Sequence, residues 1–270
     1  MAKIGLCLGG GGSRGAYQIG VAASLRDHGI LDRISSFSGT SIGAVNATLL
    51  ATAAPEAALA LWLDVSPDEI KAAEGTFRRL MKERTAVIEK GIYDISPLER
   101  RLRTHLSGVD LGAREVYVTI SRGGAAGENI VGLMKSVYRH YMKKETNVVY
   151  CDLRGQCLSD AVEAILASCS IPVAFPAVVN GERKFYDGGL YDNVPVKPLV
   201  ESGCDIVVVV HLWGLERVDA AQFPGVRLIE VWPSVSLGWM LNFDPAKAQK
   251  LYRIGYDDAE TLFRKQAFDI

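Results

Sequence analysis

Paired cysteines are missing from this sequence of 270 residues. Its five cysteines are odd in number, and no C-x-x-C pair occurs among them. This composition argues against a disulfide framework and a cysteine-based zinc site, and it predicts free thiols in a reducing compartment. No other cluster of metal-ligating residues stands out, so we expect no metal and no other cofactor.

An excess of charge of either sign is missing as well. Lysine and arginine together number 30 and the acidic residues 31, which gives a net charge of -1. There is thus no electrostatic reason to expect a nucleic-acid partner. Any attraction to a membrane must arise from local patches of the surface.

Long uncharged runs of apolar residues are the third absence. No such run reaches the roughly 20 residues that a membrane-crossing helix needs. The apolar stretch before Gly9 is too short for the hydrophobic region of a signal peptide. We therefore expect a cytoplasmic protein that is at most peripheral on membranes.

Apolar residues are nevertheless plentiful, at 49% of the chain, which is enough for one large domain over residues 1–270. The order strand, glycine turn, helix occurs twice in succession, over residues 3–28 and 34–54. Two such units predict a parallel sheet. Residues 205–211 (DIVVVVH) indicate a further strand, buried on both faces. The basic segment at about 123–147 is interpreted as an insertion.

The turn after the second predicted strand carries the sequence GTSIG, which fits G-x-S-x-G. Between a strand and a helix this pattern indicates a nucleophile elbow, a sharp turn that exposes the oxygen of Ser41 above the sheet. Gly39 and Gly43 would keep the turn free of collisions with Cβ atoms. The helix N-terminus and the N–H of Ile42 could help to bind an oxyanion. An ordinary glycine-rich turn is the alternative.

A second glycine-rich turn, GGGSRG over residues 10–15, comes after the first predicted strand. Consecutive glycines leave backbone N–H groups uncovered, and such a nest can hold the negative charge of a reaction intermediate. Arg14 could add positive potential or brace the loop. The same glycines satisfy the dinucleotide pattern G-x-G-x-x-G, but the acidic residue expected about 20 positions later is absent. Nucleotide binding is therefore disfavoured.

Asp187 is followed by two glycines and preceded by a predicted extended segment at residues 183–186. A serine nucleophile needs a base, and an aspartate in water, with a pKa of about 3.9, is a poor one near neutrality. Burial would raise that pKa, and the glycines would allow a close approach. Taken alone, this motif fits equally well an aspartate that bonds its own backbone in a turn.

In this order, the three motifs resemble the pattern of the patatin-like phospholipase family: G-G-G-x-R/K-G, then G-x-S-x-G, then D-G-G or D-G-A. Residues 167–176 (ASCSIPVAFP) resemble the family's A-S-x-x-x-P-x-x-F-P segment, and Asn193 and Pro195 resemble the family's residues after the aspartate. The match covers most of residues 3–211. It departs over residues 123–147, where an insertion near the active face could form a lid.

The resemblance implies a three-layer α/β/α fold around a mainly parallel central sheet. It implies a serine acyl hydrolase that cleaves lipid esters, of phospholipids or lysophospholipids, through an acyl-enzyme; without a metal cluster, we expect it to work independently of calcium. Ser41 would be the nucleophile and Asp187 its base. Gly10, Gly11 and Gly12 would form the oxyanion hole, supported by Arg14, Gly39, Ile42, Gly43 and Gly188.

Two other functions stay open. Ser41, Asp187 and His211 have the chain order of the triad in conventional α/β-hydrolase esterases. In that fold, however, several strands normally precede the elbow, and His211 is more simply a satisfied histidine at the end of a strand. The second alternative is a catalytically silent, lipid-binding regulatory protein, although binding alone has no use for an elbow.

Membrane contact is expected to be transient. The basic runs at residues 78–82, 100–103 and 135–144 could face anionic headgroups, or they are solvated helix faces. The apolar stretch 231–243, which contains Trp239, could line an acyl groove or pack in the core. The sequence makes no prediction of headgroup, acyl length or oligomeric state.

Overall fold

A computed structural model of the protein describes residues 2–64, 95–125, 147–170, 178–180, 183–187, 189, 191–214, 217–265 and 268. The predictions for the basic runs at 78–82 and 135–144, for Gly188 and for most of the insertion at 123–147 concern residues outside these ranges.

The described strands form one eight-stranded sheet. Its order is β5 (Val178–Asn180), β6 (Arg183–Asp187), β3 (Glu115–Ala125), β2 (Ile34–Thr40), β1 (Ile4–Leu8), β7 (Ile206–Val210) and β8 (Arg227–Val231), with β4 (Val148–Asp152) also paired to β3. From β3 to β8 all neighbours are parallel, whereas β4, β5 and β6 pair antiparallel. The mainly parallel central sheet expected from the sequence is confirmed.

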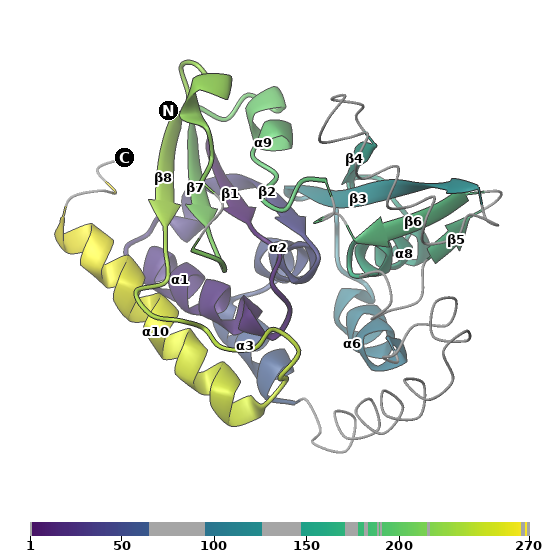
Figure 1. Ribbon diagram of the computed structural model, residues 1–270, viewed down its shortest axis with the longest axis horizontal. Helices are drawn as coiled ribbons and strands as arrows, with labels where there is room; N and C mark the ends of the chain where they lie inside the picture. Colours follow the sequence, from purple (N-terminus) through teal and green to yellow (C-terminus); the bar gives the residue numbers. More distant parts are fainter. Residues whose placement is uncertain are drawn as a thin grey trace.

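Helices cover both faces of this sheet (Figure 1). The larger core lies on the side of α1 (Ala16–Asp27), α2 (Ile42–Thr52), α3 (Pro55–Leu63), α6 (Ser96–Leu106), α8 (Leu158–Ser168) and α10 (Pro245–Arg264). The smaller core lies under α9 (Lys197–Glu201). Short 3-10 turns occur at η1 (Gly12–Gly15), η2 (Leu31–Arg33) and η4 (Ala220–Gln222).

Both faces of the sheet are apolar because apolar side chains of the central strands point alternately to one face and the other. Successive side chains of a strand point to opposite faces, so Leu6 and Val208 enter the larger core while Cys7 and Val207 enter the smaller one. All five residues of β1 and of β7 are buried. The sheet is therefore a rigid platform, and the turns at the carboxyl ends of its parallel strands are held in fixed positions.

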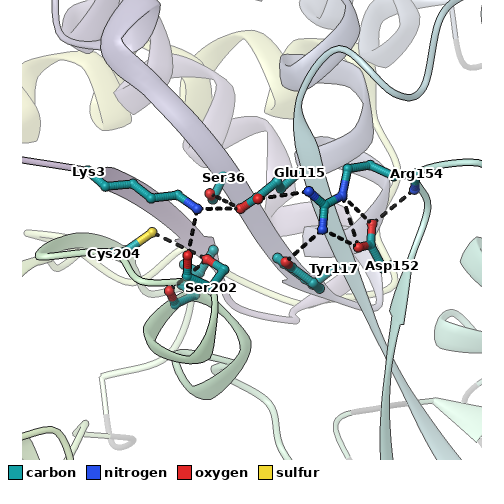
Figure 2. A network of polar contacts seen from close by, with 9 residues as sticks. Lys3, Ser36, Glu115, Tyr117, Asp152, Arg154, Ser202 and Cys204 are labelled. Carbon is teal, nitrogen blue, oxygen red and sulfur yellow. Dashed lines mark hydrogen bonds and ion pairs between the residues drawn. The ribbon is translucent and has the colours of Figure 1, made fainter.

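A polar network closes the opposite, amino-terminal edge of the parallel strands (Figure 2). Glu115, at the start of β3, accepts from Lys3 Nζ at 2.8 Å, from Arg154 Nη1 at 2.8 Å and from Ser36 Oγ at 2.5 Å. Arg154 also pairs with Asp152 at 2.6 Å. These contacts join β1, β2, β3 and the residues after β4, so the network ties four segments together away from the predicted site.

Candidate active site

Ser41 forms a turn of a single residue. The sequence predicts a strand to residue 38, a turn over 39–43 and a helix from residue 44, but β2 continues to Thr40 and α2 begins at Ile42. Ser41 has φ 56° and ψ -125°, and no other non-glycine residue in the described ranges has positive φ. Such strained backbone is the signature of a nucleophile elbow.

Gly39 and Gly43 make this sharp turn sterically feasible. A Cβ atom on Gly39 would collide with the backbone of Gly43, and one on Gly43 would collide with the carbonyl oxygen of Leu8 in β1. Gly39 thus lies inside β2 and Gly43 inside α2, and together they let α2 pack directly on β1. The N–H groups of Ile42 and Gly43 belong to the first turn of α2, which has no intrahelical acceptors for them.

Ser168 holds the elbow from α8. The backbone N–H of Ser41 donates to Ser168 Oγ at 2.8 Å, and Ser168 is fully buried. The sequence motifs assign no role to Ser168, although it is the first of the two serines in the ASCSIPVAFP segment. Its position there, next to Cys169, was the available signal.

The pairing of β2 and β6 with strand β3 brings Asp187 next to Ser41. Thr40 in β2 pairs with Thr119, and Asp187 in β6 pairs with the next residue, Ile120. Strand β4 pairs with the other edge of β3 at both Thr119 and Ile120. Strands β2 and β6 must therefore lie one after the other along the same edge of β3. The chain therefore leaves β2 at Ser41 directly beside the last residue of β6.

Asp187 is buried, with 6% of the residue exposed, and one oxygen of its carboxylate is held in place. Its Oδ1 accepts from the N–H of Gly189 at 2.7 Å, while Oδ2 is buried without a well-aligned hydrogen-bond partner in the described part of the chain. Burial raises the pKa of Asp187 to about 6, against the opposing hydrogen bonds from Ser41 and Gly189. Ser41 is thus near enough to Asp187 to lower the pKa of its carboxylate against the effect of burial.

The thiol of Cys169 lies against the same two side chains. Burial raises its pKa far above the ordinary value, and the negative charge of Asp187 adds to this, with only Ser41 opposing. A thiol that stays protonated is a poor nucleophile. Cys169 therefore fills space beside Ser41, as expected for a cysteine next to an apolar run.

The glycine turn after β1 lies beside the elbow. A Cβ atom on Gly10 would be 3.4 Å from Cβ of Ser41. The N–H of Gly10 donates to the carbonyl oxygen of Asn193 at 3.1 Å, so it is not available to a ligand. Among the described residues, no hydrogen-bond acceptor faces the N–H of Gly11 or Gly12. Of the three glycines predicted to form the oxyanion hole, Gly10 thus has its N–H engaged, and the N–H groups of Gly11 and Gly12 remain as predicted donors.

Arg14 braces this turn rather than pointing into the site. Its Nε donates to the carbonyl oxygen of Gly238 at 2.8 Å, and its guanidinium lies 3.8 Å from the ring centroid of Trp213. Gly12, at φ +58°, has the oxygen of Met240 where a Cβ would stand. The loop before α10 therefore clamps the glycine turn from outside.

His211 is fully engaged elsewhere. It is 1% exposed, its Nε2 lies 2.7 Å from Glu230 Oε2, and its ring stacks on Trp232 with centroids 3.6 Å apart. These contacts fit a structural histidine at the end of β7. Across the described residues, no group of three or more His, Cys, Asp or Glu could hold a metal ion, and no helix is long and apolar enough to cross a membrane.

Comparison with known proteins places these features in a family context. The family model of patatin-like phospholipase matches residues 6–200. An uncharacterised NTE family protein of Mycobacterium tuberculosis is 27% identical over 217 residues, which is 78% of this chain and 30% of that protein. Lysophospholipase NTE1 of Yarrowia lipolytica is 25% identical over 229 residues, 85% of this chain and 14% of the relative. The chain thus spans less than a third of the length of these relatives.

Among solved structures, VipD from Legionella pneumophila is similar over 98% of this chain and 67% of its own, with a TM-score of 0.49 and 13% identity. Human GIVD cytosolic phospholipase A2 is similar over 98% of this chain and 62% of its own, with a TM-score of 0.47 and 9% identity.

Proposed function

The chain belongs to the patatin-like phospholipase family, and we propose that it is a serine acyl hydrolase of lipid esters in which Ser41 is the nucleophile and Asp187 the base. One observation carries the proposal: the buried carboxylate of Asp187 ends a strand that pairs with β3 next to β2, beside a serine held in strained backbone. Burial raises the pKa of this carboxylate to about 6. A base with a pKa near the working pH combines a high deprotonated fraction with useful basicity.

Acylation is then explained by the positions of three groups. The Asp187 carboxylate takes the proton of the Ser41 hydroxyl as Oγ bonds to the ester carbonyl carbon. The negative charge that develops on the carbonyl oxygen is stabilised by the N–H groups of Gly11 and Gly12. When the bond to the leaving alcohol breaks, Asp187 returns the proton to that alcohol, and the acyl group stays on Ser41.

Deacylation repeats these steps with water. Asp187 takes a proton from the water as its oxygen attacks the acyl carbonyl, and the same N–H groups stabilise the second oxyanion. The bond to Ser41 breaks, Oγ recovers the proton from Asp187, and the free acid leaves. One carboxylate thus serves both halves of the reaction.

The proposed substrates are fatty acyl esters of phospholipids or lysophospholipids, met through transient contact with a membrane surface. The family, patatin-like phospholipase, and one relative, a lysophospholipase, support this substrate class. Because the chain spans a minor part of those relatives, the headgroup must be found by experiment.

A triad with His211 is the competing mechanism. The pairing of its Nε2 with Glu230 and its stacking on Trp232 favour the dyad, since both contacts hold the ring for other purposes. A binding protein without turnover is the other competitor, and it would have no need of a serine with positive φ.

Product analysis tests the proposal. The protein and its Ser41→Ala variant are incubated with matched phosphatidylcholine and lysophosphatidylcholine, and released fatty acid is measured by mass spectrometry alongside a series of p-nitrophenyl esters of graded length. We expect release by the wild-type protein only, with a preference for long acyl chains. Absence of hydrolysis across the whole panel, or equal hydrolysis by Ser41→Ala, would contradict the proposal.

A further inference from the structure

Exposed large apolar side chains gather beside the glycine turn. Over the described residues, Leu63, Trp213, Val235 and Trp239 are the large hydrophobic side chains that are exposed, and Trp239 is the most exposed at 68%. Three of these four belong to the segments after β7 and after β8. Single exposed apolar residues are ordinary, whereas a group of them marks a binding surface.

Both segments flank the glycine turn directly. A Cβ atom on Gly11 would lie 2.8 Å from the side chain of Leu212, the residue before Trp213. The N–H of Ser13 donates to the carbonyl oxygen of Met240 at 2.7 Å, and Ser13 Oγ donates to that of Trp239 at 3.2 Å. The two tryptophans therefore stand on the rim next to the proposed oxyanion hole.

Arg14 connects the two tryptophans. Its guanidinium stacks on the ring of Trp213 at 3.8 Å, while its Nε bonds to Gly238, the residue before Trp239. A guanidinium over an aromatic ring forms a cation–π contact and still leaves donor groups for an anion. We call Arg14, Trp213, Trp239 and Lys247 the indole rim.

Lys247 brings a second positive charge to this rim. Its Nζ bonds to Ser13 Oγ at 2.9 Å and to the carbonyl oxygen of Trp239. Burial lowers the pKa of Lys247, and so does the charge of Arg14, with Asp244 opposing. The two cations bond to the carbonyl oxygens of consecutive residues, Gly238 and Trp239, so they lie close together, and an anionic surface would reduce their mutual repulsion.

We propose that the indole rim is the surface through which this protein sits on an anionic lipid–water interface, with the glycine turn facing the lipid. Indole rings have an apolar body and a polar N–H, so they prefer the boundary between headgroups and acyl chains. Arginine and lysine supply the attraction to anionic headgroups. This inference rests on the proposed function, because only a lipid ester hydrolase needs its oxyanion hole at an interface.

Vesicle co-sedimentation tests the indole rim separately from turnover. The full chain is mixed at low salt with sucrose-loaded vesicles of phosphatidylcholine, with or without phosphatidylglycerol. We expect binding to the vesicles that contain phosphatidylglycerol, and a roughly tenfold weaker partition for Trp239→Ser. Trp239→Phe should restore much of the binding. The matched control is Trp232→Phe, whose half-buried ring stacks on His211, and it should bind like the wild-type protein.

Several results would overturn the inference: no binding by the wild-type protein, equal binding by Trp239→Ser, or equal losses in Trp239→Ser and Trp232→Phe. A concentration-dependent dimer that only Trp239→Ser abolishes, without vesicle binding, would instead assign the rim to a second copy of the chain. Labelling of the wild-type protein by a fluorophosphonate in the absence of lipid reports on the proposed function. A labelled protein that ignores vesicles refutes the rim alone, and an unlabelled protein that binds them refutes the hydrolase.

Discussion

Thr40 and Asp187 pair with consecutive residues of strand β3, Thr119 and Ile120, along the same edge. Ser41 leaves the sheet directly after Thr40, so the sheet itself sets the separation between the serine and the carboxylate. A site built on paired strands is more precisely placed than one built on loops. The reactivity of Ser41 should therefore depend on Asp187 and on the residues that hold the elbow against the sheet.

Removing the charge of Asp187 should abolish hydrolysis, while removing His211 should not. We expect Asp187→Asn to lower kcat by roughly 100- to 10,000-fold, the usual contribution of a general base. His211→Ala should keep most of the activity, measured below its unfolding temperature. Steady-state kinetics of both variants on a soluble p-nitrophenyl ester measures these effects. A larger loss of kcat in His211→Ala than in Asp187→Asn would favour the Ser-Asp-His triad.

Activity should depend on the titration of Asp187. The deprotonated carboxylate is the active form, so kcat/KM should rise with pH and reach half of its plateau near the pKa of about 6. A histidine base would titrate in a similar range, so the profile of His211→Ala serves as the control. We expect an unchanged inflection in that variant; its disappearance would speak for the histidine.

The charged form of Asp187 should also lower the free energy of unfolding of the protein. Its pKa in the folded protein is raised from 3.8 to about 6 by burial, so folding favours the protonated form, and stability falls as pH rises through this interval. The shift corresponds to roughly 2–3 kcal/mol. We expect Asp187→Asn to raise the free energy of unfolding at pH 8 by an amount of this order, and to lose the gain near pH 3. Denaturant unfolding at both pH values measures it, and a destabilised variant at pH 8 would be the opposite result.

Ser168 should matter for the elbow more than its neighbour Ser170 does. Ser168→Ala leaves the buried N–H of Ser41 without its acceptor, which costs about 1–3 kcal/mol and loosens the turn. Within the described residues, Ser170 Oγ bonds to the carbonyl oxygen of Leu166 in the preceding helical turn, so Ser170→Ala is the matched control. We expect about tenfold slower turnover for Ser168→Ala with KM little changed. Equal rates in the two variants would remove the positioning role.

The network around Glu115 should affect folding and not catalysis. Burial raises the pKa of Glu115, but hydrogen bonds from Lys3 and Ser36 outweigh it and leave the pKa lowered. The carboxylate therefore stabilises the fold above its unfolded pKa, and this contribution is lost as pH falls. Glu115→Gln should lower the free energy of unfolding at pH 7 by about 1 kcal/mol or more, with turnover per folded molecule unchanged. A change in kcat would tie the network to the site.

Much of this site could be predicted from the sequence because the local backbone geometry of each motif requires particular residue types, above all glycine. Gly39 and Gly43 flank a serine between a strand and a helix, and this pattern predicts the elbow, with an ordinary glycine-rich turn as the alternative. Short patterns and their order along the chain likewise predict the roles of the glycine turn and of Asp187. The sequence does not, however, predict the distance between Ser41 and Asp187, because that distance depends on the register of β6 against β3.

Other features depend on tertiary contacts alone. Ser168 comes from a distant helix, and the N–H of Gly10 is taken by a carbonyl oxygen of residue 193. The apolar stretch 231–243 contains both core residues and the highly exposed Trp239, a division that hydrophobicity cannot predict. Arg14, expected either to add positive potential or to brace the loop, braces it through contacts with two other loops on the rim.

The central claim is that Asp187 activates Ser41, and the rate of covalent modification tests it most directly. The wild-type protein, Ser41→Ala, Asp187→Asn and His211→Ala are treated with a fluorophosphonate at pH 7.5, and adduct formation is monitored by intact-mass and peptide mass spectrometry. We expect one adduct on Ser41 in the wild-type protein and in His211→Ala, none in Ser41→Ala, and labelling at least about 100-fold slower in Asp187→Asn. Labelling of Asp187→Asn at the wild-type rate, or an adduct on another residue, would contradict the claim.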